Sequence, residues 1–406
     1  MNKEQLPLNN IRVLEFTHAV MGPSAGLVLA DLGAEVIRIE PAPHGDHTRR
    51  LKGFGTGFYT YFNRNKSSIA IDLKTDDGQE IIQKLLATAD VLIENFGPGT
   101  AERLGFGYDD LSELYPALVY CRLKGFMSGP YANRVALDEV VQMMSGLAYM
   151  TGPPGQPLRA GASIIDIMGG TYGALGIILA LRERDMTGVG QLIENGLFET
   201  AAFIMGQHMA YSAISQEEIP PMAARVSPWS VYRQFETAGD QRVFIGVTSD
   251  KQWRAFCLAF DREDLLSDKE LTTNNDRIAA RDQLMPDLEA MLKSMDLPDV
   301  IYRCEKAQIP FSPIARPEDL FEDPQLNEGN SLVTVQLPDG RQAKLPRLPL
   351  AAGNHRFGLR NEAPTLGQHT RPLLKEIGYS DTTIDLLQQN EVIVAIDSQA
   401  INTQAN

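Results

Sequence analysis

The chain of 406 residues has few cysteines and little positive charge. Its cysteines, Cys121, Cys257 and Cys304, are three in number and far apart. This pattern fits reduced thiols packed in an interior better than a disulfide framework or a CxxC metal site. The 37 lysines and arginines stand against 52 aspartates and glutamates, which gives a net charge of −15. A protein of that charge repels a polyanionic backbone, so DNA and RNA are not expected partners.

Long apolar runs are also scarce. The first residues lack the apolar segment of a secretory signal, so the cytoplasm is the expected compartment. The longest apolar stretch, Ile167–Leu181, contains four glycines and falls short of the roughly 20 residues that span a bilayer. We therefore predict a buried helix there and no association with a membrane.

Several common catalytic signatures are missing. Gly22–Gly26 follow a strand-like segment but have neither the spacing nor the middle glycine of a GxGxxG, which argues against NAD or FAD. Gly53–Gly57 lack the Lys-Ser/Thr of a P-loop, and we expect a flexible loop. No HExxH or GxSxG is present, which excludes the common zinc-hydrolase and α/β-hydrolase signatures.

What is present is an alternation of strands and helices. Strand formers occupy residues 11–16, 35–40, 68–72, 91–93 and 117–120. Helical patterns fall between them at residues 27–32 and 78–89, and we expect Gly22–Gly26 to break the chain before the first helix. This order predicts the α/β fold class, with a Rossmann-like parallel sheet covered by helices.

The character of the sequence changes near residue 215. Pro220 and Pro221 interrupt the chain, and residues 250–308 are mainly helical and acidic. A hairpin is predicted from residues 332–337 and 342–345, and a last helix around residues 373–377. We therefore expect a large domain in residues 1–214, a smaller α+β domain in residues 215–330, and a C-terminal segment, residues 331–406, that returns to the large domain.

One carboxylate stands out. Asp166 lies between isoleucines and small residues, just before the apolar helix. On general grounds such an aspartate is more often a helix cap than a catalyst, because burial costs an ionised carboxylate several kcal/mol unless it is hydrogen-bonded. Desolvation would also make it a stronger nucleophile, beside glycines that let a ligand and backbone N–H groups approach. Both interpretations stand at this point.

The order of short motifs resembles the class III CoA-transferases, the carnitine and bile-acid-inducible family that includes formyl-CoA transferase. The shared motifs run almost end to end: Val13–His18 with Gly22 and Pro23, Leu32–Glu40, Gly45-Asp46 followed by Arg49, Asn63–Ser67, Ile71–Lys74, Glu94–Gly99, Arg103–Gly105 and Lys124-Gly125. The strongest block contains Asp166, Gly169, Ala180-Leu181, Arg184, Thr187-Gly188 and Gly190-Gln191.

The resemblance implies a covalent mechanism. Asp166 attacks the thioester of a donor acyl-CoA, and the CoA thiolate then attacks the resulting mixed anhydride to give an aspartyl-CoA thioester. An acceptor carboxylate takes the CoA from it. Acyl-CoA is a substrate in this chemistry, and no metal or tightly bound cofactor is needed. The family also implies an interlocked homodimer.

By position, the resemblance assigns CoA contacts to Val20, Ile71, Lys74, Asn95, Phe96, Arg103 and Lys124. Cationic side chains among these suit the phosphates, and apolar ones suit adenine. His18 and Tyr59 also lie in family motifs near the expected thioester pocket, as residues that orient the substrate.

The chain departs from formyl-CoA transferase at several positions. It has Val20 where that enzyme has glutamine, Pro41 where it has arginine, and Arg225–Tyr232 in place of a polyglycine loop. We therefore expect an acceptor other than the formate and oxalate pair, namely a small dicarboxylic or hydroxy acid. Arg225 is a candidate for its second carboxylate. Succinyl-CoA and acetyl-CoA are the expected donors.

Two alternatives remain open. A 2-methylacyl-CoA racemase uses a histidine directly before an aspartate, at the position that is Leu137 here. Without that acid–base partner, proton shuttling opposite Asp166 should fail. A non-catalytic CoA-binding protein is the second alternative, and the presence of Asp166 argues against it.

Overall fold

The computed structural model describes residues 6–225, 227–353 and 355–396. The chain forms two compact units: one runs to Ala224 and resumes at Asn327, and the other spans Arg225–Leu326. Each unit is described by itself below. The assignment of functional domains at residues 1–214, 215–330 and 331–406 stays a prediction.

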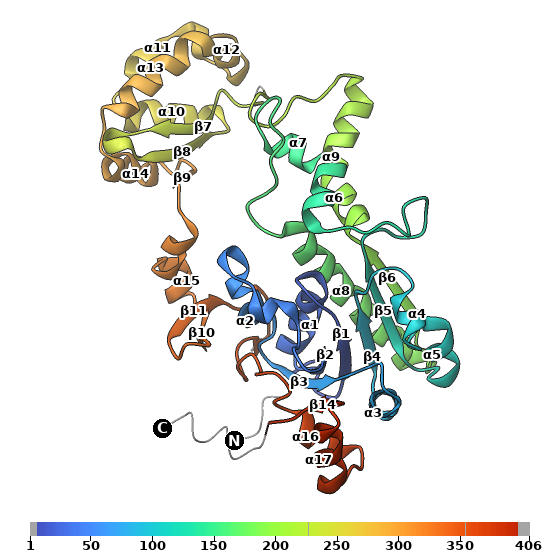
Figure 1. Ribbon diagram of the computed structural model, residues 1–406. Coiled ribbons are helices and arrows are strands. Elements are labelled where there is room, and N and C mark those ends of the chain that lie inside the picture. The colour runs from blue at the N-terminus through green and yellow to red at the C-terminus, as the bar shows by residue number, and fades with distance from the viewer. Residues whose placement is uncertain (1–5, 226, 354, 397–406) are drawn as a thin grey trace. The chain divides into compact units, whose positions relative to one another are not determined.

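The first unit is built on a seven-stranded sheet (Figure 1). In sheet order its strands are β14 (Ile393–Val394), β3 (Lys66–Ile71), β2 (Glu35–Pro41), β1 (Arg12–Phe16), β4 (Val91–Glu94), β5 (Val119–Lys124) and β6 (Leu192–Gly196). All neighbouring pairs are parallel except β14 and β3, which pair antiparallel at one edge. The predicted α/β fold with a large parallel sheet is confirmed.

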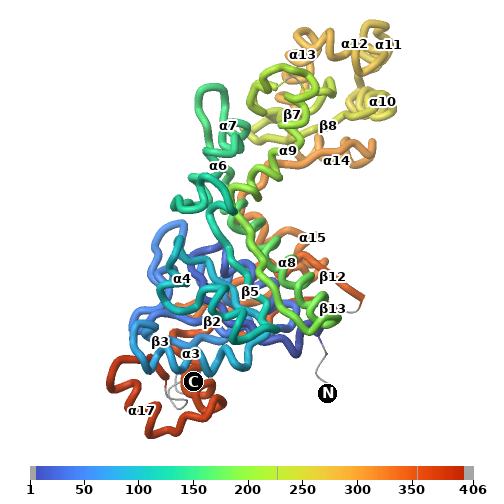
Figure 2. The backbone as a smooth tube through the Cα atoms, turned by 90° about the vertical axis from the view of Figure 1, so that its right-hand side faces the viewer, coloured from blue at the N-terminus to red at the C-terminus, as the bar shows by residue number. Residues whose placement is uncertain are grey.

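Helices cover both faces of this sheet (Figures 1 and 2). Neighbouring strand residues point to opposite faces: Val13 packs in one apolar cluster and Leu14 in the other. The Val13 cluster contains residues of α1 (Met21–Asp31), α6 (Asp138–Met144), α8 (Ile164–Thr187) and α9 (Leu197–Ser215). The Leu14 cluster contains residues of α3 (Asp76–Leu86), α5 (Tyr108–Leu114), α16 (Thr370–Glu376) and α17 (Asp381–Gln389).

Smaller elements complete the first unit. They are α2 (Phe58–Phe62), α4 (Thr100–Arg103), α7 (Leu147–Thr151), β10 (Leu332–Gln336), β11 (Gln342–Pro346), β12 (Ala351–Ala352) and β13 (His355–Arg356). Helix α15 (Pro324–Glu328) crosses the limit between the units. Strands β10 and β11 form the predicted antiparallel hairpin, and β14 places the C-terminal segment on the sheet edge. Gly53–Gly57, predicted as a loop, form a 3-10 helix.

The glycine-rich segment after β1 is helical, which corrects the prediction of a break. Helix α1 begins at Met21, and Pro23 is tolerated because the first turn needs no N–H from it. Gly26 permits close packing, since a Cβ there would overlap the carboxylate of Glu15 on β1. Gly170 of α8 plays the same role against the backbone of α1 at Met21.

Helix α8 is longer than predicted. It spans 24 residues and extends beyond the apolar stretch Ile167–Leu181 at both ends. It is long and apolar enough to cross a membrane, so the length argument against a span was wrong. Its buried residues pack against α1, β5 and β6 of the sheet core, while Leu175 and Leu179 are exposed. One face of the helix is therefore buried in the unit and the other is not.

The second unit combines a small sheet with five α-helices that lie wholly within its described residues. Strands β7 (Val231–Glu236), β8 (Arg242–Val247) and β9 (Phe311–Pro313) pair antiparallel. The helices are α10 (Asp250–Ala259), α11 (Glu263–Ser267), α12 (Asn274–Ala279), α13 (Arg281–Lys293) and α14 (Leu297–Lys306). An apolar core around Trp253, Phe256 and Leu288 holds them together, so the predicted helical character of residues 250–308 is confirmed.

Candidate active site

The order of the strands directs attention to the ends of β1 and β4. Strand order runs outward in opposite directions from this pair, and ligands of open parallel sheets bind outside the carboxyl ends of the strands at such a point. His18 follows β1 and Asn95 follows β4. The Asn95 amide accepts a hydrogen bond from the His18 backbone N–H and donates one to its carbonyl, both 2.9 Å long. These two bonds join the loops that follow the two strands.

A cavity of about 330 Å³ opens at this place in the first unit. His18 and Asn95 line it together with side chains from β5, α6 and α8. Its ionisable lining residues include Lys124, Arg134, Asp138, Glu139, Arg159 and Asp166. Acid and base side chains thus meet where the topology favours a ligand.

Asp166 lies in the first turn of α8, whose N-cap is Ser163. It is therefore not the helix cap that general frequencies favoured. Burial and the neighbouring charge of Asp138 raise the pKa of Asp166 to about 7, against a smaller opposite effect of Arg159. A carboxylate with a pKa near neutrality is a stronger base and nucleophile than an ordinary aspartate, yet it is still largely ionised at pH 8.

Asp138 takes the capping role instead. Its Oδ2 accepts hydrogen bonds from the backbone N–H groups of Ile165 and Asp166, at 2.9 and 3.1 Å. Its Oδ1 accepts from the Gln142 amide at 2.6 Å, and Gln142 accepts in turn from the Ala160 N–H at 2.8 Å. The N–H groups of Ile165 and Asp166 are thus occupied, and the start of α8 is fixed.

A second cavity, of about 450 Å³, lies over the carboxyl ends of β1, β2 and β3. Ile71, Lys74 and Asp46 are among its lining residues. His18 and Phe96 line both cavities, so the two are adjacent. The lining of the two adjacent cavities includes both Lys74 and Asp166.

The structure brings five of the seven residues assigned to CoA into this region. Ile71, Lys74, Asn95, Phe96 and Lys124 line one or both cavities. The side chain of Val20 is buried instead in a small apolar cluster with Leu27 and Phe62. Arg103 is exposed at the end of α4, and its guanidinium donates to the Thr100 hydroxyl at 2.7 Å.

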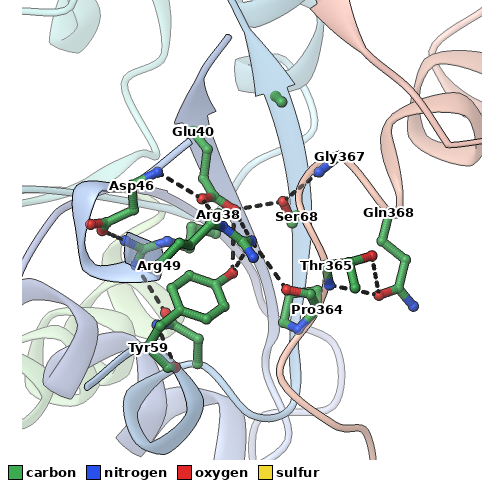
Figure 3. Close-up of polar contacts among 12 residues, drawn as sticks. Arg38, Glu40, Asp46, Arg49, Tyr59, Ser68, Pro364, Thr365, Gly367 and Gln368 are labelled. Carbon is green, nitrogen blue, oxygen red and sulfur yellow. Dashed lines mark hydrogen bonds and ion pairs between the residues drawn. The ribbon is translucent and has the colours of Figure 1, made fainter. Parts of the chain in front are cut away.

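Tyr59 lies in a buried ionic network rather than in the lining of either cavity (Figure 3). The guanidinium of Arg49 covers its ring, with 3.7 Å between the Arg49 Cζ and the ring centre. The Tyr59 hydroxyl donates to Glu40 at 3.3 Å, and Glu40 also binds Arg49 and the Ser68 hydroxyl. Although burial opposes ionisation, the hydrogen bond from Arg49 contributes to lowering the pKa of Glu40 to about 2.

Arg225 is the first residue of the second unit and is exposed. Its expected contact with an acceptor stays a prediction. Asp138, Arg134 and Arg159, in contrast, line the Asp166 cavity although we did not predict them from the sequence. The one available signal was the acidic pair Asp138-Glu139 at the start of an apolar helical pattern.

Sequence comparison supports the interpretation of this region. The model of CoA-transferase family III matches residues 8–370. Human succinyl-CoA:glutarate CoA-transferase is 30% identical over 394 residues, which cover 95% of this chain and 90% of that protein. Succinate--glutarate CoA-transferase of Agrobacterium fabrum is 32% identical, covering 93% and 97%. Succinyl-CoA--D-citramalate CoA-transferase of Chloroflexus aurantiacus is 31% identical, covering 95% and 98%.

Structure comparison agrees. The crystal structure of a CAIB/BAIF family protein from Brucella suis superposes with a TM-score of 0.82 at 30% identity, covering 92% of this chain and all of that one. The match spans both units of the chain and not a single motif. The predicted family is confirmed: the chain belongs to CoA-transferase family III and is a CoA-transferase.

Proposed function

We propose that the enzyme moves CoA from a donor acyl-CoA to a small dicarboxylic acid through covalent intermediates on Asp166. The observation that carries the proposal is the position of Asp166, a carboxylate of raised pKa in the lining of the cavity beside β1 and β4. A structural aspartate would be expected to have its charge satisfied by close partners. At Asp166 the charge of a second carboxylate, Asp138, opposes ionisation more strongly than the charge of Arg159 favours it.

The chemistry proceeds in four steps. Asp166 attacks the donor carbonyl and the carbon–sulfur bond breaks. CoA departs as the thiolate, and a mixed anhydride of Asp166 and the donor acid forms. The thiolate then attacks the side-chain carbonyl of Asp166 and expels the donor acid as its carboxylate. The acceptor carboxylate attacks the aspartyl-CoA thioester and releases the thiolate again. The thiolate finally attacks the acceptor carbonyl, which yields the new acyl-CoA and restores the Asp166 carboxylate.

The two adjacent cavities offer separate places for the two ends of CoA. Lys74 supplies a cation for phosphate and Ile71 an apolar surface for adenine in the larger cavity. Phe96 and His18 stand between that cavity and Asp166. We therefore assign the nucleotide end of CoA to the Lys74 cavity and the thioester to the Asp166 cavity.

The names of the relatives narrow the substrates. Succinyl-CoA occurs in the names of the human and Chloroflexus aurantiacus relatives, and glutarate and D-citramalate occur as partners. Both of these partners are dicarboxylic acids. We extend this pattern to the present chain and propose succinyl-CoA as donor and a dicarboxylate as acceptor, with acetyl-CoA as a second donor.

We further propose a homodimer. Tyr172, Leu175 and Leu179 on α8 and Phe203 on α9 form an apolar α8–α9 face, in which the rings of Tyr172 and Phe203 are 5.8 Å apart. Leu179 is 61% exposed and Phe203 is 72% exposed. A contiguous apolar surface of this kind is typical of a protein–protein interface.

We propose the cytoplasm as the compartment of the enzyme, because all three cysteines are free and buried.

The test is to incubate the enzyme with succinyl-CoA or acetyl-CoA and a pool of carboxylic acids, and to detect new CoA thioesters by mass spectrometry. New thioesters that Asp166→Ala does not form would support the proposal. Racemase activity would instead exchange the α-proton of a branched acyl-CoA with deuterated solvent, without new thioesters. A non-catalytic CoA-binding protein would do neither and would bind CoA unchanged.

A further inference from the structure

The Asp166 cavity has a charge problem if carboxylates react in it. Asp138, Glu139 and Asp166 already line it, and each reacting acid adds at least one more negative charge. Desolvated like charges repel strongly, so a carboxylate substrate needs a cation in the same place. Among the described lining residues three cations are available: Lys124, Arg134 and Arg159.

Two of these cations are oriented toward other groups. The Lys124 ammonium lies 3.7 Å from Glu194, which is not among the lining residues. The Arg134 guanidinium lies over the aromatic rings of Tyr131 and Phe126, at 4.9 and 5.7 Å from their centres. Among the described contacts, neither cation forms an ion pair with Asp138 or Asp166.

Arg159, in contrast, forms an ion pair with Asp138. Its Nε donates to the Ala160 carbonyl at 3.0 Å, which fixes the plane of the guanidinium. Its Nη2 lies 3.6 Å from the Asp138 carboxylate, and this nitrogen is buried without a hydrogen bond. Its Nη1 lies 3.6 Å from Glu139. Both distances exceed those of charge-assisted hydrogen bonds. The two terminal nitrogens of the guanidinium, its fork, thus lie near two carboxylates without a hydrogen bond to either.

Glu139 is the replaceable partner. It is exposed, and a surface ion pair of this length contributes little, about 0–1 kcal/mol. Asp138, in contrast, is buried and holds the first turn of α8. A substrate carboxylate that enters the cavity can therefore take the place of Glu139 on Arg159 at small cost.

We infer that Arg159 binds the distal carboxylate of dicarboxylic substrates while their other carboxyl group reacts at Asp166. The contacts from Arg159 to Asp138, and from Asp138 to the N–H of Asp166, place the guanidinium one side chain away from the nucleophile. A short diacid suits that separation. The inference rests on the proposed function and adds to it the residue that selects diacids over monoacids.

The experiment compares matched acids and matched variants. Glutarate and pentanoate have the same carbon chain and differ in the distal carboxylate, and acetyl-CoA is a donor without one. With acetyl-CoA as donor, Arg159→Gln is expected to raise the KM for glutarate by about ten- to a hundredfold, the usual effect of losing a charge-assisted hydrogen bond. The kcat/KM for pentanoate should change less than about threefold, since pentanoate lacks the group that Arg159 holds.

Three further variants serve as controls. Arg159→Lys keeps the charge without the fork and should show a smaller increase in KM. Glu139→Gln removes the competing carboxylate and should lower the KM for glutarate but not for pentanoate. Arg225→Gln tests the rival prediction from the sequence that Arg225 binds this carboxylate, and if Arg159 binds it instead, the preference for glutarate stays unchanged.

The outcomes separate this inference from the proposed function. If the unmutated enzyme forms no new CoA thioester from succinyl-CoA or acetyl-CoA with any acid of the pool, the proposed function fails. If it forms glutaryl-CoA and Arg159→Gln slows both acids equally, Arg159 is merely structural and the inference is overturned. Should Arg159→Gln not fold, an unchanged glutarate KM in Glu139→Gln overturns it as well. A selective loss in Arg225→Gln would move the carboxylate site to that residue.

Discussion

The carboxylate of Asp138 accepts a hydrogen bond from the backbone N–H of Asp166, at 3.1 Å between Oδ2 and N. Asp138 thus fixes the first turn of α8, which contains Asp166. Burial raises the pKa of the Asp166 side chain, and the nearby negative charge of Asp138 raises it further, because like charges in a partly buried site repel each other. Asp138 therefore influences both the position and the charge of Asp166, the proposed nucleophile.

This link predicts the pH dependence of the reaction. Asp166 must be ionised to attack, so the rate of aspartyl-CoA formation should rise with pH and level off above a midpoint of about 7. Asp138→Asn removes the repelling charge and should move the midpoint to lower pH by less than about two units. The measurement is the single-turnover rate from pH 5 to 9. A midpoint that stays in place would show that Asp138 does not influence the charge of Asp166.

Asn95 is predicted to position the loop that lines both cavities. Asn95→Ala removes two hydrogen bonds to the His18 backbone and should lower the free energy of unfolding by about 1–2 kcal/mol. The Michaelis constant for acyl-CoA should rise about tenfold, because the His18 loop borders the proposed CoA site. Asn95→Asp, which keeps the acceptor for the His18 N–H, should have a smaller effect. Equal KM values in all three proteins would contradict this role.

Gly26 is predicted to be required for the close packing of α1 on β1. A Cβ at this position would overlap Glu15, whose carboxylate is buried with Lys66 at 2.8 Å and Arg38 at 2.7 Å. Disturbing a buried ion pair costs about 3–5 kcal/mol, so Gly26→Ala should strongly reduce the unfolding midpoint in urea. Gly57→Ala is the matched control, because its φ of −88° is ordinary and the space beside it is open.

The α8–α9 face is predicted to be the dimer interface. Phe203→Arg places a charge in the centre of this face and should yield a monomer at micromolar concentration, measured by sedimentation equilibrium. Leu114→Arg, on α5 in the opposite helical layer, is the control and should leave the mass unchanged. A monomeric unmutated protein would contradict the proposed homodimer.

The sequence was sufficient for five of the seven strands of the large sheet, because their signals are local. The edge strands β6 and β14 were not predicted. The apolar runs near Val13, Val36 and Val91 are short and bounded by turn residues, and each became a parallel strand. The start of α1 was missed, because Gly22, Pro23 and Gly26 disfavour a helix by local propensity. Tertiary packing on Thr17 and Glu15 requires those small residues and outweighs their propensity.

Some residues of the candidate site could likewise be predicted from the sequence, and others could not. Asp166 was visible as a polar residue in an apolar segment, and the family motifs pointed to Lys74, Asn95 and Phe96. The role of Asp138 could not be read, since it lies 28 residues before Asp166 and meets it only through the packing of α6 on α8. Arg159 has no local signal either, because both of its ion-pair partners belong to α6.

Asp166 is proposed to carry CoA covalently during the reaction. The most direct measurement is the mass of the enzyme after incubation with succinyl-CoA alone, followed by acid quenching and digestion. We expect a CoA adduct on the peptide that contains Asp166, and we expect added acceptor acid to remove it. Asp166→Asn should lower the rate of transfer by about 10⁴-fold or more. An unmodified peptide together with undiminished transfer by Asp166→Asn would contradict this role of Asp166.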